Sequence, residues 1–285
     1  MPLVIGLIKA SLPSYFPERH GVFDAALAAL EEIAGACGAR IVEAEGVPMT
    51  GAEAQQALDQ CRGQGAEFIL LLHGGFTMGD VARQIALSDL PIGVWATPEP
   101  GHEGDIQLNN FVSLNMSLSI ARGVRDLRRN PVQWYFGAPE DTALRARLGR
   151  SFRALSARAA LRDARVGVIG GLAPTFYNMA VSPDTLKRAT GVEPVHVDMH
   201  RLTATMAACG AEPVAQEVAA MAARAEVRGV SDAQMALTAR AALALRQIVA
   251  EDGFAGLAVS DWPALQDDPG MHPGAAFTWL EEVDN

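Results

Sequence analysis

The amino-acid sequence predicts an α/β protein made of two consecutive Rossmann-like domains with open, mainly parallel sheets. Short apolar runs alternate along the chain with segments whose apolar residues recur at helical spacing, which is typical of parallel βαβ units. The run at 68–72 is entirely apolar, as expected for a strand that is covered on both faces. With 285 residues, the chain is long for one hydrophobic core and sufficient for two.

The first domain is predicted to span residues 1–163. Its expected strands lie at 3–10, 40–44, 68–72, 92–96 and 132–136. Its expected helices lie at about 22–34, 52–62, 81–87 and 111–128, and a long helix at about 141–160 leads to the second domain. The segment 97–109, rich in Pro, Gly and charge, is expected to be a loop.

The second domain is predicted to span residues 164–285, where the alternating pattern restarts. One helix is expected to begin after the N-cap Ser182, with Pro183 as its first residue, and to stop at Gly191. Ser231 and Gln234 have the spacing of a capping box, which predicts the start of another helix. The expected strands lie at 166–169, 194–198 and 254–260.

Composition excludes several classes of partner. The chain has 33 acidic residues against 23 Lys and Arg, and its net charge of -10 repels phosphate backbones and anionic lipids, so no nucleic-acid partner is expected. It has neither a signal-peptide pattern nor an apolar run approaching the roughly 20 residues that span a bilayer, which predicts a cytoplasmic protein with no membrane partner. Cys37, Cys61 and Cys209 lack disulfide or zinc spacing and are interpreted as buried apolar residues.

Open parallel sheets bind ligands at the carboxyl ends of their strands. The G-x-G-x-x-G fingerprint is missing there, since 170–173 reads Gly-Gly-Leu-Ala, which argues against a nicotinamide or flavin site. His73 ends the third expected strand, where it either faces a ligand or is a hydrogen-bonded structural residue. His196 falls on a strand rather than a helix, so the pair with His200 is interpreted as solvated or at the edge of the core.

The turn after the last expected strand is the most informative cluster. Asp261 and Trp262 leave the end of a buried strand together, and Gln266 follows closely. Sugars are bound by this mixture, because an aromatic face covers C–H bonds while planar polar groups bond to hydroxyls. The alternative is that Asp261 caps a helix and Trp262 belongs to the core.

Several segments resemble L-fucose isomerase-like proteins. The strand Val166-Gly-Val-Ile-Gly-Gly and the stretch 191–202 resemble the opening of that family's second domain, and 257–266 resembles its strand ending in a Cys-Trp-Pro turn with a downstream Gln. This chain has Asp261 where that Cys usually stands. In the first domain, 94–99 and 108–116 are similar to the family's loop and Asn-rich helix start.

The resemblance implies the N-terminal portion of a metal-dependent aldose-ketose isomerase of the L-fucose/L-arabinose isomerase type. Such an enzyme acts through an enediol, with a divalent metal, usually manganese, chelating two sugar oxygens while carboxylates move the proton. The family's metal ligands lie beyond the region matched here, so no metal ligand is expected in this chain. The acidic residues Glu281, Glu282 and Asp284 are therefore interpreted as solvated.

The resemblance also implies sugar contacts from Lys9, Glu99 and Gln266, and from Phe76 reaching a neighbouring subunit's site. With Asp261 and Trp262, these residues form the predicted sugar-binding set. A trimeric or hexameric homo-oligomer is implied as well. The alternative function is a non-catalytic sugar-binding or regulatory module with a cleft between two domains.

Overall fold

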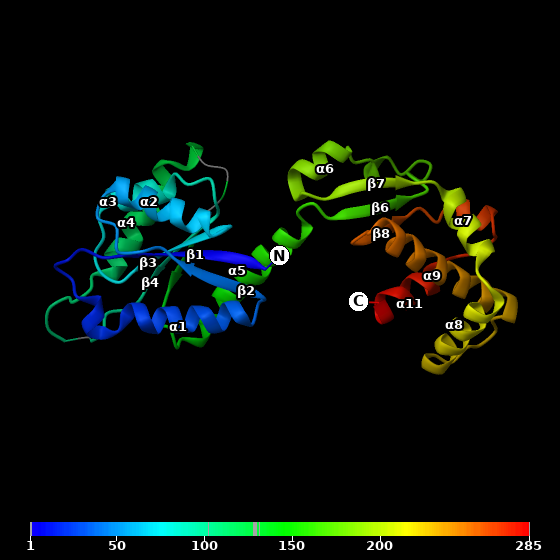
Figure 1. Cartoon of the computed structure of the whole chain (residues 1–285), viewed down its shortest axis with the longest axis horizontal. Coiled ribbons are helices and arrows are strands. Elements are labelled where there is room, and N and C mark those ends of the chain that lie inside the picture. Colours follow the sequence, from blue (N-terminus) through cyan, green and yellow to red (C-terminus); the bar gives the residue numbers. More distant parts are fainter. Residues whose placement is uncertain (1, 102, 128–129, 131, 285) are drawn as a thin grey trace. The chain divides into compact units, whose positions relative to one another are not determined.

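The computed structural model describes residues 2–101, 103–127, 130 and 132–284. The chain divides into two compact units, Met1–Ala159 and Ala160–Asn285, and the division falls inside helix α5 (Thr142–Leu161). The sequence prediction places this boundary between 163 and 164. Each unit contains a parallel sheet with helices packed on it (Figure 1), so the predicted α/β fold class is confirmed.

Unit 1 is built on a parallel sheet with the strand order β2-β1-β3-β4-β5. Its strands are β1 (Leu3–Ala10), β2 (Ala39–Glu43), β3 (Phe68–His73), β4 (Ile92–Ala96) and β5 (Val132–Phe136). The connecting helices are α1 (Val22–Gly35), α2 (Gly51–Gly63), α3 (Gly79–Ala86) and α4 (Asn110–Gly123). The register pairs Ala10 with His73 and His73 with Ala96, so the carboxyl ends of three strands meet at one edge.

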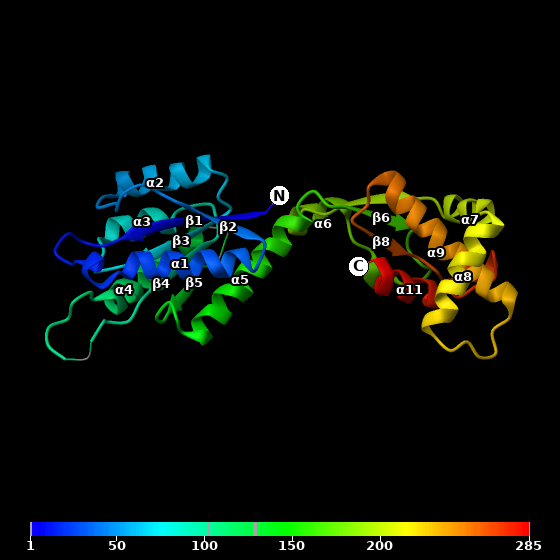
Figure 2. The ribbon, with the colours of Figure 1, turned by 60° about the horizontal axis from the view of Figure 1, so that its bottom comes forward.

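Both faces of the unit 1 sheet carry a hydrophobic core. Alternate strand residues point to opposite faces, so Ile8 and Leu7 belong to different cores. Helices α2, α3 and α4 supply one core, and α1 and α5 supply the other. Figure 2 shows α2 and α1 on opposite sides of β1. Every residue of β3 is buried, as its continuous apolar sequence predicts.

Unit 2 has a smaller parallel sheet with the order β7-β6-β8, formed by β6 (Arg165–Ile169), β7 (Glu193–Val197) and β8 (Gly256–Val259). Its helices are α6 (Pro183–Thr190), α7 (Met199–Ala208), α8 (Ala211–Arg224), α9 (Asp232–Asp252), α10 (Ala264–Asp267) and α11 (Gly274–Asp284). Helices α7, α8, α9 and α11 build one core with Ile169 and Val197. Helix α6, by contrast, has no buried residue.

The helix boundaries of unit 2 follow their sequence signals. Ser231 and Gln234 form a full capping box at the start of α9. Ser182 is the N-cap of α6 and Pro183 its first residue, but the Ser182 side chain makes no capping hydrogen bond. Gly191 follows α6 in the left-handed region with φ of 86°, which glycine adopts without strain.

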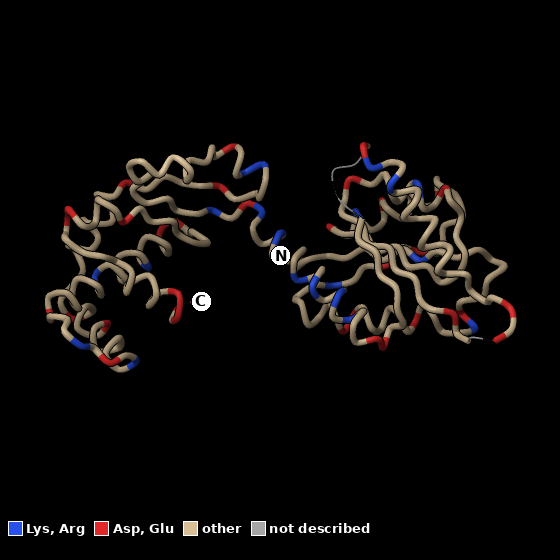
Figure 3. Tube along the Cα trace, turned by 180° about the vertical axis from the view of Figure 1, so that it is seen from behind, with Lys and Arg blue, Asp and Glu red and all other residues tan. Residues whose placement is uncertain are grey.

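The charged residues of both units mix the two signs. Figure 3 shows Lys and Arg interspersed with Asp and Glu over much of the chain, with a run of arginines along α5. Within the residues that the structure describes, none of the helices combines the length and the apolar composition needed to cross a membrane.

Candidate functional site

Three residues of the predicted sugar-binding set lie at or just after the carboxyl ends of β1, β3 and β4. Lys9, near the end of β1, donates to Glu43 Oε1 at 3.0 Å, and its side chain is 21% exposed. Its Nζ also lies 5.6 Å from the centre of the Phe23 ring. The Lys9 ammonium is therefore held against its own sheet by a carboxylate on the neighbouring strand.

His73 is fully buried at the end of β3. Its Nδ1 lies 2.9 Å from Thr77 Oγ1 and its Nε2 lies 3.0 Å from Ser117 Oγ, so both ring nitrogens have hydroxyl partners. Burial disfavours the charged imidazolium and lowers the pKa of His73 from 6.5 to about 3. The structure places His73 in the structural role that the sequence left open.

Phe76 lies in the loop that leaves this end of β3. Its ring is half-buried and packs against Tyr15, with ring centres 6.3 Å apart, while its carbonyl accepts the Leu12 N–H at 2.7 Å. The loops after β1 and β3 are thus joined side by side. Gly75 permits this contact, because a Cβ there would lie 2.7 Å from Tyr15 Cβ and would overlap Ser11 Oγ.

Glu99 has its carboxylate occupied by backbone groups. Oε2 accepts the N–H groups of Gln107 at 3.0 Å and Leu108 at 2.8 Å, and Oε1 accepts that of Asn109 at 2.6 Å. These donors precede α4, whose N-cap Asn109 makes no side-chain capping bond of its own. The Glu99 carboxylate therefore anchors the start of α4, which is where a negative charge is favourable.

Sequence reasoning missed the polar side chains beneath these loops. Asn110 is fully buried and donates from Nδ2 to Thr97 Oγ1 at 2.9 Å, while its Oδ1 has no partner among the described residues. Ser113 Oγ accepts the Thr77 N–H at 3.1 Å. The run of small polar residues at the start and middle of α4 was the available signal, because such residues are uncommon on a buried helix face.

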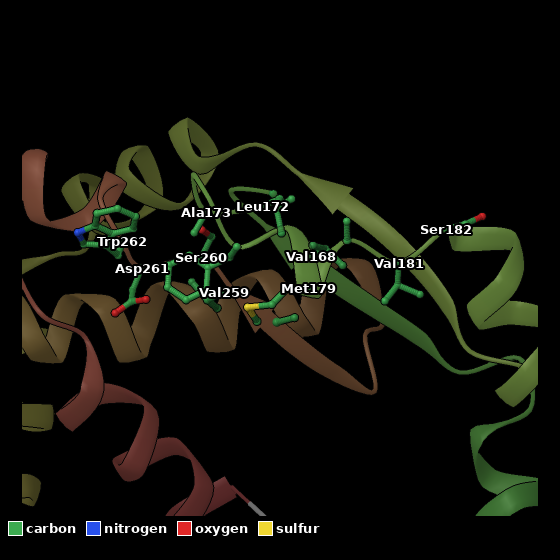
Figure 4. Close-up of a pocket in the computed structure, with 14 residues that line it drawn as sticks. Val168, Leu172, Ala173, Met179, Val181, Ser182, Val259, Ser260, Asp261 and Trp262 are labelled. Atoms are coloured by element: carbon green, nitrogen blue, oxygen red, sulfur yellow. The ribbon is translucent and has the colours of Figure 1, made fainter.

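Unit 2 contains a hollow of about 800 Å³ where β6 and β8 end. One wall is the loop after β6, and the other is the end of β8, as Figure 4 shows. The wall from the loop is mostly apolar, and the wall from β8 adds polar groups. The lining residues used below are Val168, Phe176, Ala258, Ser260, Asp261 and Trp262.

Two predicted residues, Asp261 and Trp262, lie together at one end of this hollow (Figure 4). The Trp262 ring packs edge-on against Phe176, with ring centres 6.0 Å apart at 60°, and remains 42% exposed. The Asp261 carbonyl accepts the Leu265 N–H at 2.9 Å, which fixes the turn after the strand. An aromatic residue, a serine and an aspartate thus line the same hollow.

Gln266 lies in α10 and is not among the described residues that line the hollow. Its side-chain Nε2 lies 3.1 Å from His272 Nδ1. The structure therefore divides the predicted set into three parts. Lys9, Phe76 and Glu99 are in unit 1, Asp261 and Trp262 line the hollow, and Gln266 stands beside it.

The side chains that the structure describes do not fit a metal site. In the parts of the chain that the structure describes, no group of three or more His, Cys, Asp or Glu residues is placed to hold a metal ion. His196 is exposed on β7, whereas the backbone N–H of His200 donates to Asp198 at the start of α7. At the end of the chain, Asp284 is paired with Arg246 at 2.6 Å rather than simply solvated.

The cysteines are free thiols. Cys61 is buried, and burial raises its pKa from 9.0 to about 11, which keeps it protonated and unreactive. Cys37 and Cys209 are only partly buried, which corrects the expectation that all three are buried.

Comparison with known proteins places the chain near sugar isomerases. No family model matches it. Two relatives named sulfoquinovose isomerase, from Priestia aryabhattai and Priestia megaterium, are each 24% identical over 279 residues, covering 94% of this chain and 60% of the relative. A sulfoquinovose isomerase from Alkalicoccus urumqiensis is 26% identical over 193 residues, covering 68% of this chain and 43% of the relative.

The chain therefore spans less than two thirds of the length of these curated relatives. At this low identity, the similarity supports a relationship to sugar isomerases in general, not specifically to the L-fucose/L-arabinose type.

Proposed function

We propose that this chain forms the sugar-binding N-terminal portion of an aldose-ketose isomerase. The observation that carries the proposal is the similarity to sulfoquinovose isomerases along 94% of the chain, because it extends through both units. The hollow at the ends of β6 and β8 supports it independently. Its aromatic surface suits the C–H face of a sugar, and its polar groups suit hydroxyls.

Asp261 and Trp262 have distinct roles in this proposal. The Trp262 ring, held by Phe176, stacks on the sugar, and the Asp261 carboxylate accepts hydrogen bonds from hydroxyl groups. Glu99 and Lys9 act indirectly, because each is bonded to its own unit and holds a loop or strand end in place. No step through a metal is assigned to these residues, since the described side chains form no metal site.

The decisive measurement is calorimetric titration of the purified chain with aldoses and ketoses, including sulfoquinovose. We expect saturable binding of at least one sugar. Trp262→Ala should weaken it about three- to ten-fold, which corresponds to the loss of one aromatic contact. Tyr177→Ala is the matched control, because Tyr177 is 80% exposed and is not one of the described residues that line the hollow.

The enzymatic part of the proposal requires a separate test. Isomerisation through an enediol, manganese dependence and assembly as a trimer or hexamer are proposed for the whole protein, by its resemblance to the L-fucose/L-arabinose type. This chain by itself should bind sugar without turnover, with or without manganese, because its described residues lack a cluster of metal ligands. Turnover by the purified chain would contradict this assignment.

The competing function is a sugar-binding module without catalysis. The observation that favours it is the same combination of a hollow and no described metal cluster. A protein as long as the curated relatives would distinguish the two functions. An isomerase of that length would interconvert the bound sugar when manganese is supplied, whereas a binding module would leave the sugar unchanged.

A further inference from the structure

The hollow at the ends of β6 and β8 has a single charged side chain among its described lining residues. That side chain is Asp261, which Figure 4 shows close to Ser260 and Trp262 at one end of the hollow. The other described lining residues are apolar or carry neutral polar groups, and none of them is Lys, Arg or His. The charge that a ligand meets in this hollow is therefore negative.

The Asp261 carboxylate has no counter-ion in the part of the chain that the structure describes. Its backbone carbonyl accepts the Leu265 N–H, but its side chain makes no hydrogen bond or ion pair with another described residue. The residue is half-buried, and a charge partly removed from water is screened less than one on an open surface. The carboxylate thus remains free to attract or repel a ligand.

Both walls of the hollow come from segments that lack basic residues. No Lys or Arg occurs between 166 and 186, which includes the loop after β6, or between 247 and 285, which includes β8 and the turn after it. Asp267 and Asp268 add further negative charge shortly after that turn. Lys187, the first basic residue after the loop of β6, is paired with Glu193 at 2.9 Å. Neither wall therefore supplies a basic side chain for an anionic ligand.

The apolar wall adds a second cost for an anion that does not depend on Asp261. Leu172, Phe176 and Met179 line the hollow from the loop after β6. An anionic group placed against these side chains would lose hydration without gaining a hydrogen-bond donor in return. Hydroxyl groups lose much less on leaving water, and they can donate to the Asp261 carboxylate or bond to the Ser260 hydroxyl. The lining thus favours an uncharged ligand over an anionic one of similar shape.

We propose that this hollow selects uncharged sugars over sugars that carry a sulfonate or phosphate group, and that Asp261 is the residue that determines this selectivity. The selectivity rests on the proposed sugar-binding function and narrows the ligand from sugars in general to neutral ones. Trp262 contributes equally to neutral and anionic sugars, because its ring contacts C–H groups. Asp261 distinguishes them, because it accepts hydroxyl protons and repels a second negative charge.

The test is calorimetric titration of the purified chain with matched pairs of sugars: glucose and sulfoquinovose, fructose and fructose 6-phosphate, arabinose and arabinose 5-phosphate. We expect the neutral member of a pair to bind about ten-fold more tightly than the anionic one. Asp261→Asn should reduce this ratio at least about three-fold, and the variant should fold, because the side chain has no described partner to lose. Glu282→Gln is the matched control, since it removes one exposed negative charge of α11 outside the hollow and should leave the ratio unchanged.

Salt gives a second readout that needs no variant. Raising the ionic strength from about 0.05 M to about 0.5 M should lower the ratio in the wild-type chain, because salt screens the repulsion by Asp261. An anionic sugar that binds as tightly as its neutral counterpart would overturn the selectivity and leave the sugar-binding function standing. So would a ratio that Asp261→Asn leaves unchanged. If no member of any pair binds, the sugar-binding function itself is contradicted, and the selectivity with it.

Discussion

At the scale of single residues, Glu99 shows how a carboxylate can serve the backbone instead of a ligand. Removing it in Glu99→Ala leaves three N–H groups at the start of α4 without their acceptor. We expect a loss of about 1–2 kcal/mol in the free energy of unfolding, measured by urea denaturation. Glu103→Ala, at an exposed position of the same loop, is the control and should be nearly neutral. Equal losses in both variants would contradict the anchoring role.

The buried His73 makes stability depend on pH. Its pKa is about 3 in the folded chain and 6.5 as the ordinary value, so the unfolded chain binds more protons between these limits. Neutral His73 makes its full contribution to the free energy of unfolding above pH 6.5. Below that pH the contribution is lost, by up to about 1.4 kcal/mol per pH unit. Urea midpoints between pH 7.5 and 4.5 should fall less steeply for His73→Gln, which keeps hydrogen-bonding atoms but does not titrate. Parallel slopes would rule out this contribution.

The sequence could indicate residue types at strand ends but not their partners. Asp261 and Trp262 come just after β8, which ends at Val259, so their place at its carboxyl end could be predicted. Phe176 faces Trp262 only because the loop after β6 folds over the end of β8, a non-local contact that no local pattern contains. Glu99 likewise finds its partners through the path of the loop between it and α4.

At the scale of elements, two serine N-caps give contrasting predictions. The Ser231 hydroxyl accepts the Gln234 N–H at 3.3 Å, and the Gln234 side-chain Oε1 accepts the Ser231 N–H. Ser231→Ala should therefore cost about 1 kcal/mol of stability. Ser182→Ala should cost much less, because that side chain makes no capping bond to α6. Thermal melts of the two variants compare them directly, and a larger loss at Ser182 would contradict the observed geometry.

Periodicity identified the strands well, but some helix ends were wrong. The helix predicted at 111–128 stops at Gly123, where α4 gives way to a short 3-10 turn at Arg125–Leu127. Helix α11 was not predicted, because its sequence ends in an acidic run that resembles a solvated tail. It forms because Phe277, Trp279 and Leu280 pack on the unit 2 core, a gain that appears only when that core exists.

At the scale of the whole molecule, the units differ in how their sheets are covered. Unit 1 has a core on each face of its sheet, whereas the described core of unit 2 involves one face. We expect amides of β3 to exchange with solvent far more slowly than those of β7, which has one buried residue. Hydrogen exchange followed by mass spectrometry measures both in one sample. Equal protection of the two strands would show that the cores do not determine local stability.

The anchoring of α4 by Glu99 determines where the loop before this helix can accept insertions. Because the Glu99 carboxylate binds the backbone at 107–109, the loop that starts after Glu99 is closed by these hydrogen bonds. Doubling the length of such a closed loop costs only about 0.6 kcal/mol of closure entropy. Insertions near exposed Gly104, which has φ of 82°, should thus be accepted without moving α4, whereas an insertion between Gln107 and Asn109 would break the anchor itself.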